Sequence, residues 1–316
     1  MKKILLALLF TLSFSQLFSQ GCSDAGFCTM GAMRPDQNYN KKINLKLRTV
    51  EYNFYRGKTT STAVIYAHTL EFNTSLNEKN TIQFKVPYTL VSGNLGNNRG
   101  LGDISVSYTR NLKTFNGWIM SGTLGFKVPT NNANDQFSSN FSSNEEVPLP
   151  MYYQVSLGSF DLVAGASWIS ENWLLATGIQ IALTENNNNF AISDWSSYPN
   201  QNYLQTYDEG KDLKRGIDVM LRIERNFRFV NYNFSIGLLP IYRITRDEVF
   251  LPEQNQRVKL PGTTGLALST LASFGYNLNV KNQLKAIYGY KITDRKTNPD
   301  GLTRDNVLSV SYIYKF

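Results

Sequence analysis

The end of the chain alternates strictly between two kinds of side chain. One parity holds Leu308, Val310, Tyr312, Tyr314 and Phe316, and the other holds Val307, Ser309, Ser311, Ile313 and Lys315. A period of two predicts a β-strand with one apolar face. Because the chain ends on an aromatic residue rather than a polar tail, this stretch is typical of the closing strand of an outer-membrane β-barrel. An edge strand of a soluble sandwich is the alternative that the stretch alone leaves open.

The same alternation recurs along the chain from residue 42 onward. We expect strands at residues 42–54, 64–72, 82–90, 104–109, 118–128, 160–169, 173–184, 215–225, 232–244, 264–276, 284–292 and 306–316. In the first of these the apolar parity slips between Leu47 and Val50, which predicts a β-bulge. Pro240 falls inside another, and since proline cannot donate to a ladder, we expect a bulge or a local break there.

The connections between these strands alternate in length. Residues 73–79, 112–117 and 170–172 are short, whereas residues 92–102, 131–159 and 185–213 are long. Outer-membrane barrels combine short periplasmic turns with longer outer loops and an even number of strands. The sequence therefore predicts an all-β fold, a transmembrane antiparallel up-and-down β-barrel of about 12 strands (roughly 10–14) over residues 42–316. We expect both termini in the periplasm of a Gram-negative bacterium.

Aromatic residues support this assignment. Trp118, Trp168 and Trp173 lie beside predicted periplasmic turns and on the lipid-facing parity, and with Tyr314 and Phe316 they form a predicted aromatic girdle in contact with outer-membrane lipid. Aromatics make up 13% of the chain, and beyond the first 20 residues no apolar run approaches the ~20 residues of a spanning helix. A barrel meets these facts together, as would one large soluble all-β domain.

The amino terminus predicts export. Lys2 and Lys3 precede an apolar run from residue 4, and the pattern indicates a signal peptide over residues 1–20. Lipid attachment at Cys22 is the less favoured alternative, because Ser19 stands where a lipoprotein site has an aliphatic residue. Cleavage leaves 30 basic residues, 32 less the two lysines, against 24 acidic ones. Without a basic cluster, this modest excess gives no reason to expect nucleic acid as a partner.

Residues 21–41 form a polar segment with two cysteines before the first strand. Cys22 and Cys28 are the only cysteines, and in an exported chain they are expected to form a disulfide. The alternative is a copper(I) site that adds Met30 and Met33 as soft ligands. We expect the segment to enter the barrel as a plug, with Phe27, Met30 and Met33 against the wall; a disordered periplasmic leader is the alternative.

Charged residues also occupy the parity that faces the predicted interior. These are Lys85, Lys127, Asp218, Arg222, Glu224, Arg243, Lys285 and Lys291. Buried charge must be paired or hydrated. A network that braces the wall and a polar conduit are both compatible with this pattern, because pairing across a lumen depends on shear and register.

Two short motifs resemble a known family. Gly100-Leu101-Gly102-Asp103 enters a predicted strand, and Gly125-Phe126-Lys127-Val128-Pro129-Thr130 ends the next. Together with Gly158-Ser159-Phe160-Asp161 they resemble the phenol-degradation meta-pathway transporter family of outer-membrane barrels, which is distantly like the long-chain fatty-acid channels. Asn131 departs from the glycine of that family, and the amino-terminal segment matches nothing in it. The resemblance implies passive uptake of small hydrophobic compounds, with an amino-terminal segment that enters the barrel as a hatch.

Three functions follow as hypotheses. The first is a channel for small, hydrophobic or aromatic compounds. The second is a structural or partner-binding subunit of a larger outer-membrane complex, with the loops at 131–159 and 185–213 as the partner surface. The third is a phospholipase-like enzyme that uses the sole histidine, His68, but no serine motif accompanies it, so an interfacial, hydrogen-bonded histidine is the better interpretation. We expect no enzyme activity, cofactor or metal.

Overall fold

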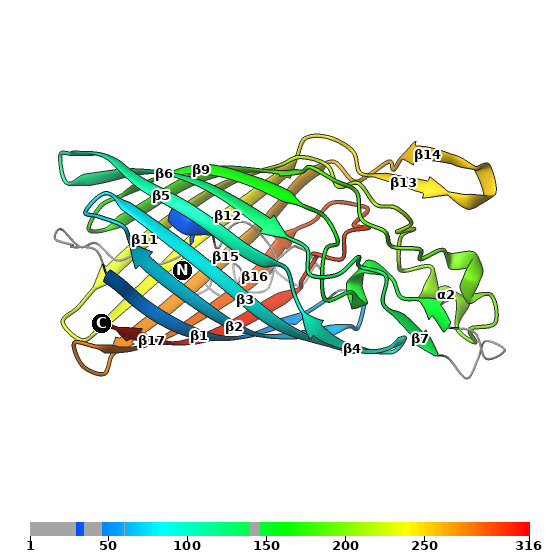
Figure 1. Ribbon diagram of the computed structural model, residues 1–316, viewed down its shortest axis with the longest axis horizontal. Helices are drawn as coiled ribbons and strands as arrows, with labels where there is room; N and C mark the ends of the chain where they lie inside the picture. The colour runs from blue at the N-terminus through cyan, green and yellow to red at the C-terminus, as the bar shows by residue number, and fades with distance from the viewer. Residues whose placement is uncertain (1–29, 35–45, 60, 139–145) are drawn as a thin grey trace, which may run out of the picture.

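The computed structural model describes residues 30–34, 46–59, 61–138 and 146–316. Twelve strands form its wall: β1 (Lys46–Lys58), β2 (Val64–Ser75), β3 (Asn80–Gly93), β5 (Ile104–Phe115), β6 (Trp118–Val128), β9 (Asp161–Ile169), β10 (Trp173–Ala182), β11 (Asp218–Arg228), β12 (Tyr232–Arg243), β15 (Gly265–Asn277), β16 (Asn282–Thr293) and β17 (Asn306–Lys315). Consecutive wall strands pair antiparallel, and β17 pairs with β1 from Thr49↔Lys315 to Lys58↔Asn306. The barrel is therefore closed, which confirms the predicted fold class and strand number (Figure 1).

The alternation of apolar and polar residues in the sequence corresponds to an alternation between the outer and the inner face of the wall. In β17, Tyr312 is 43% exposed on the outer face whereas its neighbour Ser311 is 2% exposed inside. The same contrast runs around the barrel, so the outer surface is apolar and the inner one is polar or charged. Only alternate residues of each strand need to face lipid, which is why no long apolar run is required.

The two ends of the barrel differ. At one end the wall strands are joined by short turns, at residues 76–79, 116–117, 170–172, 229–231 and 278–281, and the carboxyl terminus lies there too (Figure 1). The other end carries the long connections. We refer to these as the short-turn end and the long-loop end.

The region expected as a loop at residues 92–102 is instead part of the sheet. β3 continues to Gly93 and turns into β4 (Gly96–Leu101), which pairs back onto it. The prediction was wrong here because β4 is mostly polar, so no apolar alternation marks it, and its pairing rests on backbone hydrogen bonds. The register slips between Tyr88↔Leu101 and Lys85↔Ser105, so β4 and β5 act as one strand with a bulge at Gly102 and Asp103.

The other long connections carry short elements of their own. These are β7 (Gln136–Ser138), β8 (Glu146–Pro148), η3 (Met151–Tyr153), η4 (Ile192–Trp195), α2 (Gln201–Leu204), β13 (Glu248–Leu251), η5 (Pro252–Gln254) and β14 (Gln256–Lys259). The hairpin of β13 and β14 projects from the long-loop end (Figure 1). Across the described ranges, no helix has the length and apolar character needed to span a bilayer.

Two local irregularities appear where the sequence predicts them. The β1–β2 register shifts between Leu47 and Thr49. Around Pro240, β12 keeps its ladder to β15, but the β11–β12 pairs are interrupted between Met220↔Ile241 and Ile223↔Leu238. Since proline has no amide hydrogen, the break falls on the side where its donor is missing.

Candidate functional site

A short segment of the amino-terminal region lies inside the barrel. This lumen segment, residues 30–34, contains η2 (Gly31–Met33) and touches β5, β6, β9 and β10. Met33 is fully buried and Met30 nearly so. A Cβ added at Gly125 would lie 2.4 Å from Met30 Sδ, and one added at Gly165 would lie 2.4 Å from Met33 Sδ. Two glycines in the wall thus leave the room that the two methionines fill.

Hydrogen bonds from three wall strands fix the backbone of the lumen segment. Gly31 N donates to Gln83 Oε1 at 2.7 Å, and Ala32 N donates to Thr123 Oγ1 at 3.0 Å. From the far side, Arg222 Nη1 donates to the Met33 carbonyl at 2.8 Å. In the wall β3 and β6 are separated only by β5, but β11 is five strands away from β3 among the twelve, so the segment bridges the lumen from the β3–β6 side to β11.

Ion pairs hold the end of the same segment. Arg34 pairs with Glu71 of β2, and Lys85 Nζ lies 3.2 Å from the other oxygen of that carboxylate. Gln83 Nε2 and Asn73 Nδ2 also donate to Glu71, at 2.6 and 2.8 Å. Glu71 therefore has cationic and neutral donors around it, which offsets the cost of burying its charge.

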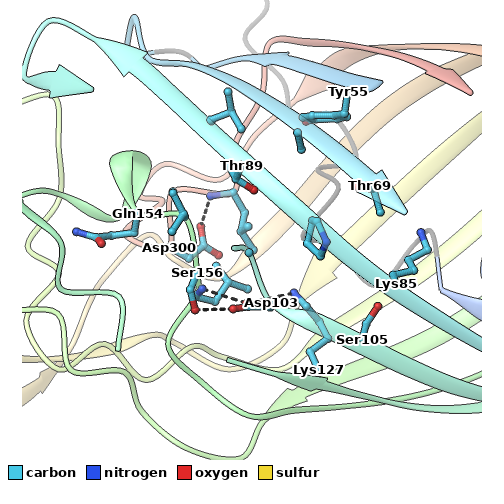
Figure 2. A pocket seen from close by; sticks show the side chains of 18 of the residues that line it. Tyr55, Thr69, Lys85, Thr89, Asp103, Ser105, Lys127, Gln154, Ser156 and Asp300 are labelled. Atoms are coloured by element: carbon cyan, nitrogen blue, oxygen red, sulfur yellow. Dashed lines mark hydrogen bonds and ion pairs between the residues drawn. The ribbon is translucent and has the colours of Figure 1, made fainter. Parts of the chain in front are cut away.

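The motif residues come together closer to the long-loop end. Lys127 Nζ lies 4.0 Å from Asp103 Oδ2, as Figure 2 shows, and 3.9 Å from Asp161 Oδ2, so one buried lysine lies between two buried carboxylates. Asp103, turned inward at the bulge, also accepts hydrogen bonds from Ser156 Oγ and from Leu157 N at 3.0 Å. The three stretches that resemble a family thus dock the long loop that follows β6 onto the inner wall.

A second ion cluster surrounds Arg243. Its guanidinium is 1% exposed and contacts Asp218 at 2.5 Å, Asp247 at 2.8 Å and Asp300 at 2.8 Å. Arg295 Nη2 lies 3.4 Å from Asp300. Burial raises the pKa of Asp300, but attraction to Arg243 and Arg295 outweighs it and holds the pKa below its ordinary value. The cluster ties β11 and β12 to two loops at the long-loop end.

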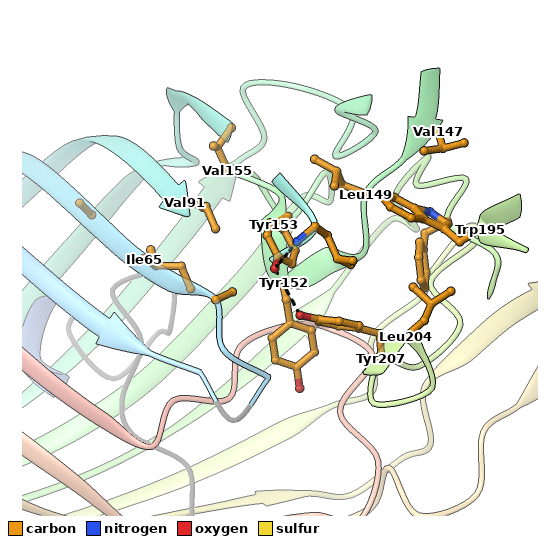
Figure 3. Packing of buried hydrophobic residues seen from close by; sticks show 14 of the residues in the cluster. Ile65, Val91, Val147, Leu149, Tyr152, Tyr153, Val155, Trp195, Leu204 and Tyr207 are labelled. Carbon is orange, nitrogen blue, oxygen red and sulfur yellow. Dashed lines mark hydrogen bonds between the residues drawn. The ribbon is translucent and has the colours of Figure 1, made fainter. Parts of the chain in front are cut away.

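Loops also cover the mouth of the barrel. Residues 147–157 and 190–207, which we call the loop cap, pack apolar side chains against the inner faces of β1, β2, β3 and β17 (Figure 3). Tyr207 is buried among them; its hydroxyl donates to the Ser61 carbonyl at 2.7 Å and lies 2.7 Å from the Tyr203 hydroxyl. Burial raises the pKa of Tyr207, so its hydroxyl stays a neutral donor. The cap is therefore a packed unit and not an open rim.

The lumen segment separates cavities inside the barrel. A cavity of about 400 Å³ at the short-turn end is lined by Gly31, Ala32 and Phe316, among others. Toward the loop cap, a cavity of about 70 Å³ is lined by Met30, Lys127 and Gln154 (Figure 2). An adjoining one of about 60 Å³ is lined by Arg34, Arg222 and Lys285. The described residues thus form a vestibule, a crossing segment and an inner chamber.

The predicted site residues fall as follows. Seven of the eight charged interior candidates are buried inside the barrel, and Lys85 is half-buried there. The girdle candidates gather at the short-turn end, where Trp118, Trp168 and Tyr314 are partly exposed and Trp173 and Phe316 are exposed. Cys22, Cys28 and Phe27 lie outside the described residues, as do the signal peptide and the proposed disulfide. Within those described, no group of three histidine, cysteine or acidic side chains is placed to hold a metal ion.

Sequence reasoning missed several carboxylates and arginines that complete the ion clusters. Asp247, Arg295 and Asp300 lie in loops, where alternation assigns no side to a residue, and Asp161 and Arg215 lie at the first positions of predicted strands, where the face of a residue is least certain. The one available signal was the charge-rich stretch 294–305, which holds three aspartates and two arginines.

Comparison with known proteins identifies the fold. No family model matches the chain, and no curated protein matches it. Among solved structures, the outer membrane channel from Pseudomonas putida F1 matches with a TM-score of 0.58 at 13% identity, over 89% of this chain and 99% of that one. The translocator domain of the autotransporter NalP from Neisseria meningitidis matches with a TM-score of 0.50 at 10% identity, over 88% and 90%.

A third match is an enzyme of the outer membrane. The outer membrane phospholipase of Salmonella typhi gives a TM-score of 0.40 at 10% identity, over 88% of this chain and 94% of that one, a likeness too low to support an argument. At these identities the similarities show the architecture alone. The chain has the fold of outer-membrane β-barrels.

Proposed function

We propose that this protein is an outer-membrane channel for the passive uptake of small, hydrophobic or aromatic compounds, and that the lumen segment is its plug. The observation that best supports this proposal is the position of the lumen segment. It bridges the lumen through hydrogen bonds to three strands and separates the vestibule from the inner chamber. An apolar outer face and a polar inner one support the membrane location.

The substrate class in this proposal comes from the family resemblance. The motifs at 100–103, 125–130 and 158–161 resemble those of the phenol-degradation meta-pathway transporters, and the similarity to the Pseudomonas channel agrees with a barrel fold. Apolar side chains such as Ile65 and Val307 line the cavities below the loop cap and offer contacts to a hydrophobic solute.

The plug proposal gives a direct expectation for conductance. Removing residues 23–37 should leave barrel assembly intact, because β1, the first wall strand among the described residues, begins at Lys46, and should raise single-channel conductance well above that of the full-length protein. Planar bilayer recordings on purified protein measure this. Unchanged conductance in correctly folded, truncated barrels would rule the plug out.

A matched pair of substitutions tests the same idea without a deletion. In Gly125→Leu the new side chain occupies the space of Met30, so the segment should be displaced and conductance should rise. In Gly122→Leu, three residues away on β6, a Cβ meets only Leu112 at an ordinary 3.6 Å. Equal conductance in the two variants would show that the methionine contact does not hold the plug.

The proposal also fixes an orientation, with short turns in the periplasm and long loops outside the cell. Single cysteines at Asn134 and Asn200 should therefore react with an impermeant maleimide on intact cells, in a variant that lacks Cys22 and Cys28. Cysteines at Asn172 and Lys281 should react only after lysis. Labelling of Asn172→Cys on intact cells would reverse the orientation.

A partner-binding barrel remains the second candidate, and the observation that favours it is the β13–β14 hairpin. This hairpin projects from the long-loop end and its tip, residues 253–256, is exposed (Figure 1). The loop cap, by contrast, directs its apolar side chains into the barrel. Purification from native membrane in mild detergent tests this candidate, since a stoichiometric partner lost on removal of residues 248–259 would support it.

We propose no catalytic role for His68. It lies on the outer parity of β2, where its Nδ1 is 2.6 Å from the Tyr52 hydroxyl and its ring stacks on that of Tyr52. Serine-dependent hydrolysis would require a serine hydroxyl in the place that this tyrosine takes.

A further inference from the structure

We propose that the outer wall binds the phosphorylated head of lipopolysaccharide at the long-loop end of β1–β4. This inference goes beyond the channel function, and it rests on the proposed orientation, which places the long-loop end in the outer leaflet. It is carried by three cations that face away from the lumen. We call them the cation patch: Arg56, Lys58 and Arg99.

The cation patch spans four neighbouring strands. Arg56 of β1 pairs with Tyr66 of β2. Tyr66 pairs in turn with Leu90 of β3, and Leu90 pairs with Arg99 of β4. Lys58 lies two residues beyond Arg56, at the end of β1. Since neighbouring strands are ~4.8 Å apart, the Cα atoms of Arg56 and Arg99 are separated by roughly 14 Å, which one headgroup with several charges can bridge.

The charges of the patch are open to a ligand. Tyr55 and Gly57, which alternate with the two cations of β1, are buried on the inner side, so Arg56 and Lys58 point outward. Lys58 and Arg99 are exposed, and Arg56 is half-buried. Within the part of the chain that the structure describes, none of the three side chains makes an ion pair or a hydrogen bond.

The surface around the patch is apolar and holds no compensating carboxylate. Among the described residues of β17 and β1–β4, no aspartate or glutamate has an outward position, since Glu51 and Glu71 are both buried on the inner face. Next to the patch, Phe54 and Tyr66 stack with ring centroids 6.2 Å apart. A ligand for this surface therefore combines negative charge with hydrocarbon.

The patch occupies one sector of the barrel. On six strands elsewhere in the wall, the outward position nearest the long-loop end is apolar or aromatic; these residues are Val128, Leu162, Ile181, Val219, Tyr242 and Leu266. A basic rim around the whole barrel would indicate only the general attraction of cations to a charged membrane surface. Three cations gathered on β1–β4, which lie side by side (Figure 1), indicate one bound molecule.

Lipopolysaccharide has the required combination of groups. It forms the outer leaflet of a Gram-negative outer membrane, and its lipid A part carries two phosphates on a disaccharide directly above several acyl chains. Phosphates accept strong, charge-assisted hydrogen bonds from arginine. The two phosphates would meet the patch while the acyl chains lie against the apolar wall. A glycerophospholipid with one phosphate would leave part of the patch uncompensated.

Native mass spectrometry of the full-length protein in detergent tests the ligand, because it resolves bound lipids by mass. Lipid A with both phosphates should bind. Monophosphoryl lipid A, which keeps the acyl chains, should bind at least about fivefold more weakly, the factor that corresponds to the ~1 kcal/mol of one basic residue at an anionic membrane surface. Equal binding of monophosphoryl lipid A or of phosphatidylglycerol would overturn the proposal, as would displacement of lipid A by an equal concentration of inorganic phosphate.

Variants locate the binding on the outer wall. The triple variant Arg56→Gln, Lys58→Gln, Arg99→Gln should weaken lipid A binding about a hundredfold, at about fivefold for each cation. Arg225→Gln is the matched control. Arg225 also faces outward, with its Cζ 5.0 Å from the centre of the Trp173 ring, but it lies at the short-turn end. This control should bind lipid A as the native protein does, and an equal loss in both variants would overturn the assignment.

Mobility on a gel before and after boiling checks that each variant assembles. Should the triple variant fail to assemble, Arg99→Gln alone replaces it, with an expected loss of about fivefold, whereas Arg99→Lys should retain most of the binding because the charge is kept. Undiminished binding in the assembled glutamine variant would overturn the site.

The outcomes separate this inference from the channel function. If deletion of residues 23–37 raises conductance but the triple variant binds lipid A as the native protein does, the channel stands and the cation patch is not a lipid site. If lipid A binding requires the patch and conductance does not change, the lipid site stands and the plug does not. Labelling of Asn172→Cys on intact cells would place the patch in the periplasmic leaflet and overturn lipopolysaccharide as its ligand.

Discussion

Deletion of residues 314–316 is expected to leave no folded barrel. Tyr314 pairs with Val50 of β1 and with Asn282 of β16, and Lys315 N donates to the Lys281 carbonyl at 2.7 Å. Phe316 N donates to the Arg48 carbonyl at 3.0 Å. The truncation removes these bonds on both sides of β17, and unpaired backbone groups within a bilayer cost several kcal/mol each.

Heat-modifiable mobility on a gel measures this, since a folded barrel migrates differently before and after boiling. The truncated chain should show only the unfolded position and should be degraded in the periplasm. Deletion of residues 253–255, which are three exposed residues at the tip of the β13–β14 hairpin, is the matched control and should assemble normally. Normal mobility of the carboxyl-terminal truncation would mean that β17 does not close the barrel in the cell.

The second large effect is expected at Arg243. Arg243→Leu leaves Asp218, Asp247 and Asp300 without their shared cation, although Arg295 still neighbours the last two. Removal of one partner from a buried ion pair costs about 3–5 kcal/mol, because the remaining charges stay buried. The pKa of Asp300 should rise, since attraction to Arg243 is what mainly opposes the effect of burial.

Urea unfolding of the refolded protein in lipid vesicles measures this loss. Lys259→Leu serves as control, because its ion pair with Glu248 is 3.7 Å long and exposed, and such a pair contributes about 0–1 kcal/mol. At acid pH the free energies of unfolding of the native protein and of Arg243→Leu should partly converge. In the native protein, the stabilisation from Asp300 is fully present above the ordinary pKa of this carboxyl and is lost only as the pH falls through its lowered pKa in the folded state. Similar unfolding midpoints for the two variants at neutral pH would show that the cluster does not brace the wall.

Most of the barrel wall could be predicted from the sequence. Alternation such as Ser311 against Tyr312 assigns each residue to a face, and parity in the lengths of the connections requires an even number of strands, so twelve strands could be placed from pattern alone. β4 could not be found this way because its residues carry no apolar stripe. The elements of the loop cap were missed for a related reason: four-residue pieces such as α2 owe their form to tertiary packing and not to a local period.

The interior was predictable only in part. Parity indicates that Arg243 and Asp218 face inward, but not that Asp247 and Asp300 meet them, because loops have no period and the contacts join segments far apart in the sequence. Likewise the hydrophobic pattern assigns no role to Gly125 and Gly165. Their role is evident only from the structure, in which Met30 and Met33 fill the space beside them. Glycine on an inward parity, combined with a flexible apolar side chain such as methionine elsewhere in the chain, is a signal that the sequence analysis did not use.

The contacts that hold the lumen segment affect the order in which the protein assembles. Its three backbone bonds come from Gln83, Thr123 and Arg222, so the partners lie roughly 50, 90 and 190 residues further along the chain. None of these partners has been synthesised when residues 30–34 leave the ribosome. The segment can therefore complete its native contacts only after β3, β6 and β11 have taken their places in the wall.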